Sequence, residues 1–493
     1  MKTLKESIKK IVIDKKLYIF TIFTLLFFGI YCVMQYAPDT YSVFTNAPRQ
    51  NLDHFFSCGR LVTGLFLYGT MGILELNATT VYMISYGLAI ICTIASLYKI
   101  DKIFTEDIKD TKLSILASLL IIINVFSIEL FVYVEKGILM LSVLLCVLAV
   151  EQIKKFLEGK KKAFLWALFF MLIANCCYQG TVGLVVAVGM LYIIKYSKNV
   201  KEFIKNNILV ALVYGIPAIL NFIMVRFLFT NSRVKGDIIL TESLKKIYEG
   251  TKSMIFANYD LLPKYLFAII LLGLVVFLIY QIIKKAESIK TKILEILGIF
   301  YIIIGTVFVT ITPQIMQDTN SIWFVARSSY PVASLIGILL IYATMRIEIR
   351  KMTKIGILMI ATIFLGIQFV SFMRYNIDNY IVNGIDRQNV EQIQAKILEY
   401  EEKTGKQITK IAFYEDKMPN YTYPNMKATG DMNLKALYKD WSALRVIRYY
   451  TGRNLEQIEK NEEIQKEFKE KNWNYYNDEQ LIFEDDVLHL CNF

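Results

Sequence analysis

Carboxylates and an arginine follow the first long apolar run of the chain. Pro38 ends that run, Asp39 comes next, and Asp53 and Arg60 lie further along the same loop. Because proline stops a helix, we expect Asp39 at the mouth of a membrane. A carboxylate placed there can take a proton from a hydroxyl, which makes Asp39 and Asp53 candidate catalytic bases. Acids in loops are more often simply solvated, and that alternative stays open for both.

Further polar residues recur in the alternate loops. Ionisable groups at membrane depth are expensive to bury and mark sites by default, and an arginine fork suits a phosphate. Arg60 and Arg327 are therefore candidate ligands of a phosphate. Glu135 is a candidate for binding a substrate, although it could instead form a trivial surface ion pair with the adjacent Lys136. The candidates for binding a substrate, through polar groups or by stacking on a sugar ring, are Tyr41, Glu135, Tyr178, Gln179 and Trp323.

The amino-acid composition limits the class of protein that can contain these residues. Of the 493 residues, 55% are hydrophobic and 20% are charged, and the net charge is +12, with a mean hydropathy of +0.44. Soluble domains average about 25% charged residues. An ordinary cytosolic enzyme, a disordered chain and a coiled coil are excluded, and nucleic acid is not an expected partner.

The apolar runs predict a polytopic α-helical membrane protein, because about 20 apolar residues are needed to cross a bilayer as a helix. Residues 61–74 are apolar but too few to cross, and they predict an interfacial or re-entrant helix. Asn175, Gln179 and Gly180 favour a hairpin over one long helix in 163–196. The eleven expected spans are 17–37, 78–98, 113–131, 134–152, 163–177, 180–196, 207–229, 263–283, 293–312, 330–345 and 355–374.

The positive charge is distributed by loop. Six alternate segments, the first of them residues 1–16, carry 27 Lys and Arg residues, whereas the intervening five carry nine. Basic loops remain in the cytoplasm. The pattern predicts a multi-pass plasma-membrane protein with a cytoplasmic N-terminus and an extracytoplasmic C-terminus.

Two domains are expected. Residues 1–375 form the transmembrane domain, with a catalytic first outer loop at 38–77. Residues 376–493 contain 16 basic and 21 acidic residues and no further span. Apolar spacing predicts a helix at 388–400, and 408–414 and 480–490 are typical of strands. This tail is predicted to be a small extracytoplasmic α/β domain.

Several kinds of site lack the residues that they need. The chain has two histidines, no CxxC pair, and neither a Walker-type nor a Rossmann-type glycine loop. We therefore assign no metal-ligand residues. A requirement for a divalent cation, Mg²⁺ or Mn²⁺, stays open.

Three short motifs carry a resemblance to a known family. Pro38-Asp39-Thr40-Tyr41 with Cys58-Gly59-Arg60, then Cys177-Tyr178-Gln179-Gly180, and then Val325-Ala326-Arg327-Ser328 follow one another along the chain. In this order they resemble the bacterial membrane glucosyltransferases of the type II Gtr family, which belong to the GT-C superfamily. Leu444-Arg445-Val446-Ile447 and the closing segment 483–493 look like the end of that family's chains. Many members have two adjacent acids where this chain has Asp39-Thr40, and this departure counts against a pair of metal-binding carboxylates.

The resemblance implies a GT-C-like fold and a hexosyltransferase. The donor would be a polyprenyl-phosphate sugar, with glucose as the expected hexose, and the acceptor a surface glycan or a lipid-linked glycan on the outer face. Asp39 would be the general base, Arg60 and Arg327 would hold the donor phosphate, and Tyr178 and Gln179 would line the sugar pocket.

Three other functions compete with this interpretation. A transporter or flippase of lipid-linked oligosaccharides would need charges at mid-membrane and inverted repeats, and the chain shows few such charges and no repeat. A polysaccharide polymerase would also place arginines in outer loops. A non-enzymatic surface anchor would not need eleven spans.

Overall fold

The computed structural model describes residues 14–492 except 109, 230–238, 286–287, 316, 347–350, 418–428, 430–432, 434, 440 and 474–475. The chain divides into two compact units. Unit 1 comprises Met1–Cys32 and Pro48–Met373, and unit 2 comprises Val33–Ala47 and Arg374–Phe493.

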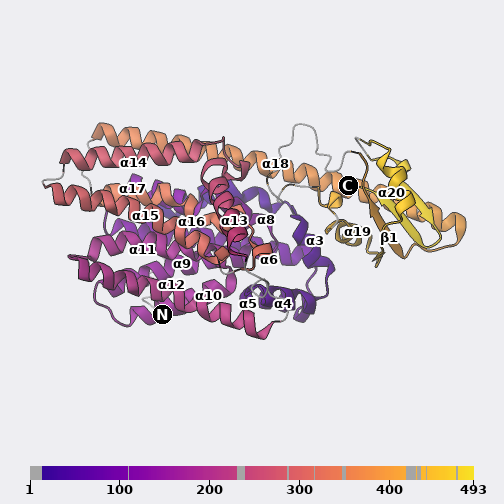
Figure 1. The fold of residues 1–493 in the computed structure, drawn as a ribbon, viewed down its shortest axis with the longest axis horizontal. Coiled ribbons are helices and arrows are strands. Elements are labelled where there is room, and N and C mark those ends of the chain that lie inside the picture. The colour runs from indigo at the N-terminus through magenta and orange to yellow at the C-terminus, as the bar shows by residue number, and fades with distance from the viewer. Residues whose placement is uncertain are drawn as a thin grey trace. The chain divides into compact units, whose positions relative to one another are not determined.

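Unit 1 is a bundle of long helices that run side by side (Figure 1). Its first half contains α2 (Lys15–Phe28), η1 (Gly29–Cys32), α4 (Pro48–Ser57), α5 (Leu61–Leu67), η2 (Tyr68–Ile73), α6 (Ala78–Thr105), α7 (Thr111–Ile122), η3 (Val125–Ser127), α8 (Ile128–Val132), α9 (Lys136–Leu157), α10 (Ala163–Cys177), η4 (Gln179–Thr181) and α11 (Gly183–Tyr196).

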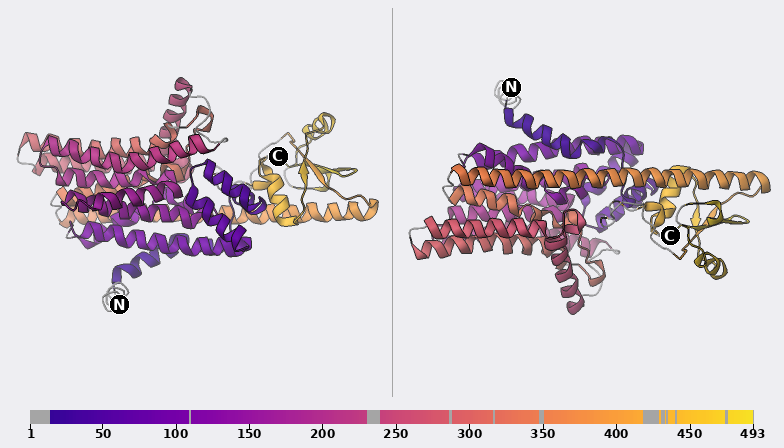
Figure 2. Two further views of the ribbon diagram at one scale, coloured as in Figure 1. Left: turned by 90° about the horizontal axis from the view of Figure 1, so that it is seen from below. Right: turned by 90° about the horizontal axis from the view of Figure 1, so that it is seen from above.

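The second half of unit 1 continues the bundle, and the amphipathic α13 lies across the direction of the long helices in all the views (Figures 1 and 2). The elements are α12 (Val200–Leu228), α13 (Leu240–Lys252), η5 (Ser253–Ala257), η6 (Asn258–Asp260), α14 (Leu266–Lys285), α15 (Ile289–Ile315), η7 (Thr319–Ser321), η8 (Ala326–Ser329), α16 (Tyr330–Ala333), α17 (Leu335–Arg346) and α18 (Lys351–Thr404), of which unit 1 takes the part up to Met373.

Long apolar helices dominate this unit and indicate a multi-pass membrane protein. Within the described ranges, nine helices are long and apolar enough to cross a bilayer, and the bent pair Thr111–Ile122 and Val125–Val132 gives a tenth. The remaining expected span, 163–177, is the 15-residue helix α10, which is shorter than a straight crossing needs. The expected short apolar helix at 61–74 is Leu61–Ile73.

The helices begin where the sequence supplies caps and pack where it supplies small residues. Asn77 accepts a hydrogen bond from the Thr80 backbone N–H at 2.8 Å and so caps α6. The backbone N–H of Gly137 donates to Ser85 Oγ at 2.9 Å. A Cβ at Gly137 would lie 2.7 Å from the Ser85 carbonyl oxygen, so α6 and α9 approach closely only because that residue is glycine.

Unit 2 is a small α/β unit. Its elements are α3 (Pro38–Thr45), the part of α18 from Arg374, β1 (Lys410–Tyr414), η9 (Ala436–Tyr438), α19 (Ala443–Thr451), β2 (Glu456–Gln457), α20 (Glu462–Lys469), η10 (Asp478–Gln480), β3 (Leu481–Glu484) and β4 (Val487–Cys491).

The sheet of unit 2 has the order β2-β1-β4-β3. The central strand β1 pairs in parallel with β4, with Tyr414 opposite Cys491, and β3 and β4 form an antiparallel hairpin. One face is covered by α20, whose Ile464 and Phe468 pack against Tyr414. The expected strand at 408–414 matches β1. The expected strand at 480–490 is instead two strands, β3 and β4, because the chain turns at Asp485, whose φ is positive.

One segment groups with an unexpected part of the chain. The sequence places 38–47 in the first outer loop of the transmembrane domain, but Val33–Ala47 belongs to unit 2. There α3 packs against α19, and the Asn383 side chain both accepts from the Tyr36 backbone N–H at 2.6 Å and donates to the Tyr36 carbonyl at 3.0 Å. The expected helix at 388–400 is part of the 54-residue helix α18.

Candidate functional site

Arg60 is held in unit 1 by an unusual turn at Gly59. The φ of Gly59 is +73°, and a Cβ there would lie 2.4 Å from Asn221 Oδ1 and 2.8 Å from Gln179 Nε2. Only glycine combines this left-handed backbone with such close neighbours. The Gly59 carbonyl accepts hydrogen bonds at 2.8 Å from both Gln179 and Asn221. This turn directs Arg60 onto the face of the Tyr178 ring, 4.7 Å from its centroid.

Arg327 is held by a different set of contacts. Its backbone N–H donates to Glu129 Oε2 at 2.6 Å, and its Nη1 lies 3.4 Å from Glu129 Oε1. The guanidinium lies over the Tyr133 ring at 4.0 Å, and the Tyr133 hydroxyl donates to Glu129 at 3.3 Å. Glu129 is buried, so a cation beside it is needed to offset the cost of removing its charge from water.

Glu135 and Lys136 add two further buried charges. Glu135 Oε1 lies 4.0 Å from Arg60 Nη1. Lys136 is 0% exposed, and its ammonium lies 3.4 Å from the centroid of Tyr82 and 5.5 Å from that of Tyr31. Within the described part of the chain, Lys136 Nζ has no hydrogen-bond partner. The expected alternative, a trivial surface pair of Glu135 with Lys136, is therefore wrong, because both side chains are buried.

These five charged residues form what we call the Arg60–Arg327 cluster: Arg60, Glu129, Glu135, Lys136 and Arg327. Tyr178 interacts with Arg60, Arg327 and Glu129 and so connects the two arginines. Burial raises the pKa of the Tyr178 hydroxyl, while both arginines act against this and Glu129 adds to it. Counted by formal charge, the three basic and two acidic side chains give the cluster a net charge of +1.

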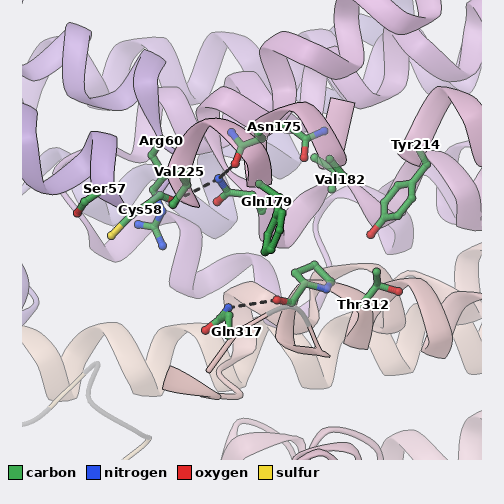
Figure 3. A pocket seen from close by; sticks show the side chains of 14 residues that line it. Ser57, Cys58, Arg60, Asn175, Gln179, Val182, Tyr214, Val225, Thr312 and Gln317 are labelled. Atoms are coloured by element: carbon green, nitrogen blue, oxygen red, sulfur yellow. Dashed lines mark hydrogen bonds between the residues drawn. The ribbon is translucent and has the colours of Figure 1, made fainter. Parts of the chain in front are cut away.

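A cavity of about 130 Å³ opens beside this cluster in unit 1. Figure 3 shows Arg60, Asn175 and Gln179 on one side and Thr312 and Gln317 on the other. The apolar part of its wall comes from the residue that precedes α11 and from α12 and α15: Val182, Ala218, Phe222, Val225 and Pro313.

Two polar atoms at this cavity stay without a hydrogen-bond partner among the described residues. They are Arg60 Nε, a donor, and Gln317 Oε1, an acceptor. Unpaired buried polar atoms are costly and rare in folded proteins. Their position at an apolar cavity fits a ligand with a polar head and an apolar body.

The structure brings together five of the nine residues expected from the sequence. Arg60, Glu135, Tyr178, Gln179 and Arg327 meet through the contacts described above. Asp53 lies on α4, is 61% exposed, and makes an i,i+4 pair with Arg49 at 3.5 Å. Trp323 is 58% exposed, and its backbone N–H and carbonyl bond the Gln314 side chain.

Asp39 and Tyr41 lie in unit 2. Asp39 is in the first turn of α3, where a carboxylate favours the helix N-terminus, and its side chain is exposed. Burial lowers the pKa of Arg445 on α19, and the Asp39 carboxylate opposes that shift.

Tyr41 is fully buried, and its hydroxyl hydrogen-bonds that of Tyr450 at 3.1 Å. It packs edge-on against Tyr36 and Tyr449. In this arrangement Tyr41 holds α3 against α19, and its ring is not open to a sugar.

Sequence reasoning left Lys136, Asn221 and the tyrosines that surround the charges out of the site. The available signal was a lysine at the start of an apolar run, which is costly unless it is used. The described residues contain no group of three or more His, Cys, Asp or Glu side chains able to hold a metal ion.

Comparison with known proteins adds no family. No protein-family model matches the chain, and neither a curated protein nor a solved structure does.

Proposed function

We propose that this protein is an integral-membrane glycosyltransferase that moves a hexose from a polyprenyl-phosphate donor to a glycan or lipid-linked acceptor. The observation that carries the proposal is the Arg60–Arg327 cluster beside a mainly apolar cavity. The sequence resemblance described above supplies glucose as the expected hexose and the outer face of the plasma membrane as the expected location.

The charge of the cluster matches the donor. A sugar linked to a polyprenyl phosphate is a phosphodiester and carries a single negative charge. The cluster has one positive charge in excess, and the Arg60 guanidinium reaches the cavity. Arginine forms charge-assisted hydrogen bonds with phosphate oxygens. Among the described residues the Arg60 Nε–H has no acceptor, so it can donate to a phosphate oxygen.

The cavity suits the rest of such a donor. Valine, alanine, phenylalanine and proline side chains offer the apolar surface that a polyprenyl chain prefers. Gln179, Asn221 and Asn175 supply amides of the kind that bind sugar hydroxyls. Gln179 and Asn221 are already fixed by the Gly59 carbonyl, so they would be oriented before a substrate arrives.

The reaction follows from these parts. The oxygen of an acceptor hydroxyl attacks the anomeric carbon, and the bond between that carbon and the phosphate oxygen breaks. The bonding electrons leave with the polyprenyl phosphate, whose added charge Arg60 and Arg327 stabilise. The acceptor proton passes to a general base, the role that the sequence resemblance gives to Asp39. A direct displacement inverts the anomeric configuration.

The test uses membranes that contain the full chain and a polyprenyl-phosphate sugar labelled in the sugar. We expect label to appear in glycan and unlabelled polyprenyl phosphate to accumulate in equal amount. Asp39→Asn should reduce this transfer by at least about 100-fold, since removing a positioned base costs about that much. Glu459→Gln, which removes an exposed carboxylate elsewhere in unit 2, is the matched control and should keep full transfer.

The competing functions give different results in the same assay. A flippase or transporter would move the labelled lipid across the membrane without releasing polyprenyl phosphate. A polymerase would transfer preassembled oligosaccharides and leave a single hexose on its lipid. Full transfer by Asp39→Asn would remove Asp39 as the base and leave the donor site untouched.

A further inference from the structure

A second hollow lies at the opposite end of α9, between α6 and the loop that follows α9. Its volume is about 110 Å³. Its polar lining contains five lysines, Lys99, Lys102, Lys154, Lys155 and Lys160, and three carboxylates. Five minus three leaves two positive charges in excess.

The three carboxylates, Glu106, Glu151 and Glu158, are each already engaged. Glu151 pairs with Lys99 at 2.9 Å and with Lys155 at 3.1 Å. Glu106 pairs with Lys154 at 2.9 Å.

The third carboxylate and Lys154 are also bonded. Glu158 accepts a hydrogen bond from the Tyr196 hydroxyl at 2.8 Å. Lys154 is also fully bonded, to Glu106, to Asp107 and to the Ile103 carbonyl.

Lys102 and Lys160 supply the excess charge. Neither ammonium makes an ion pair or a hydrogen bond with any residue that the structure describes, although both side chains line the hollow. They come from different segments, α6 and the α9–α10 loop, so two independent parts of the backbone bring them to one place. The hollow therefore carries excess positive charge, while every carboxylate of its lining is already bonded.

We propose that this hollow binds a phosphate group, presented either by the headgroup of an anionic phospholipid or as free phosphate. Lysine binds phosphate as a point charge and needs no fixed fork. The hollow lies at the end of the helices where basic residues accumulate, and basic pockets between membrane helices at that end bind lipid headgroups. This site is independent of glycosyl transfer, because it shares no residue with the Arg60–Arg327 cluster.

The experiment uses the full chain in nanodiscs of phosphatidylcholine with or without one fifth phosphatidylglycerol. The readouts are the unfolding temperature and the phospholipid retained by the protein in native mass spectrometry. We expect phosphatidylglycerol to raise the unfolding temperature and to be retained. The double variant Lys102→Gln/Lys160→Gln should lose both effects, with retention falling at least fivefold.

The matched control is Lys161→Gln/Lys162→Gln, which removes two exposed charges from the same loop without touching the lining of the hollow. Inorganic phosphate added to phosphatidylcholine discs distinguishes the source. If phosphate alone stabilises the wild type but not the Lys102/Lys160 variant, the site takes free phosphate. Equal loss in both double variants, or no response to either anion, overturns the proposal.

Discussion

Both ends of α9 carry a buried lysine, and the two are treated in opposite ways. Lys154, near the last turn, makes three bonds of about 3 Å to two carboxylates and a carbonyl. Lys136, at the first position, has aromatic faces around it and no hydrogen-bond partner within the described ranges. About 27 Å of helix separates them.

The difference teaches how to tell a structural charge from a functional one. At Lys154 the geometry satisfies each donor, which is what a buried ion pair needs in order to be tolerated. In the Arg60–Arg327 cluster the pairs are longer, at 3.4 and 4.0 Å, and a positive charge is left in excess. The first arrangement stabilises the fold as it stands, whereas the second is suited to gaining an anionic ligand.

The largest expected effect is a loss of stability at Lys154, the closely bonded lysine near the last turn of α9. Lys154→Met leaves the buried Asp107 carboxylate with one ion-pair partner among the described residues, Lys195, and should destabilise the protein by about 3 kcal/mol. Thermal unfolding in detergent measures this. Lys155→Met, at a half-exposed neighbour paired with Glu151, is the control and should cost less than about 1 kcal/mol. Equal losses would remove the contrast between the ends.

The second effect is on sugar transfer by the Arg60–Arg327 cluster, at the other end of α9. Arg60→Gln should lower sugar transfer about 100-fold, because one donor that stabilises the leaving phosphate is lost, and should change the unfolding temperature little. Arg49→Gln removes an arginine that is 73% exposed and should leave transfer unchanged. A large drop in unfolding temperature in Arg60→Gln would show that the cluster is structural.

The third prediction applies the same substitution to the other lysine of α9. Lys136→Met removes a desolvated charge that makes no hydrogen bond, so the unfolding temperature should stay constant or rise. Transfer should fall about tenfold, since the cluster loses its positive excess before the donor binds. Opposite changes in stability in Lys136→Met and Lys154→Met are the clearest test of the comparison. Parallel losses would contradict it.

The smallest effect is expected at Asp53. Its pair with Arg49 is solvated on both sides, so Asp53→Asn should change stability by less than about 0.5 kcal/mol. Transfer measured on the same membranes decides its remaining role. A loss of transfer like that of Asp39→Asn would assign a catalytic role to Asp53.

The sequence predicts the helices well because the membrane imposes a simple rule. Runs of about 20 apolar residues must form helices, and each expected span corresponds to a helix or a bent pair. The tail strands lie in short, mostly apolar runs. The count differs at α10, where 15 residues are apolar enough but short.

The site is only partly predictable, because its geometry depends on contacts between distant segments. Arg60 and Arg327 are visible in the sequence as arginines in loops that the charge pattern predicts to be outer ones. That Lys136 is buried against Tyr82, or that α3 packs on α19, depends on tertiary packing that no local pattern encodes. Tyr41 shows the limit, since an aromatic residue in a loop can equally contact a sugar or fill a core.

The turn at Gly59 has a consequence for how the protein tolerates change. In a saturation library selected for surface glycan, position 59 should accept glycine alone, because any side chain collides with Asn221 and Gln179. Arg49, an exposed residue of the preceding helix α4, should in contrast accept most substitutions. Gly59, a residue without a side chain, would then be as intolerant of substitution as Arg60, the arginine that follows it.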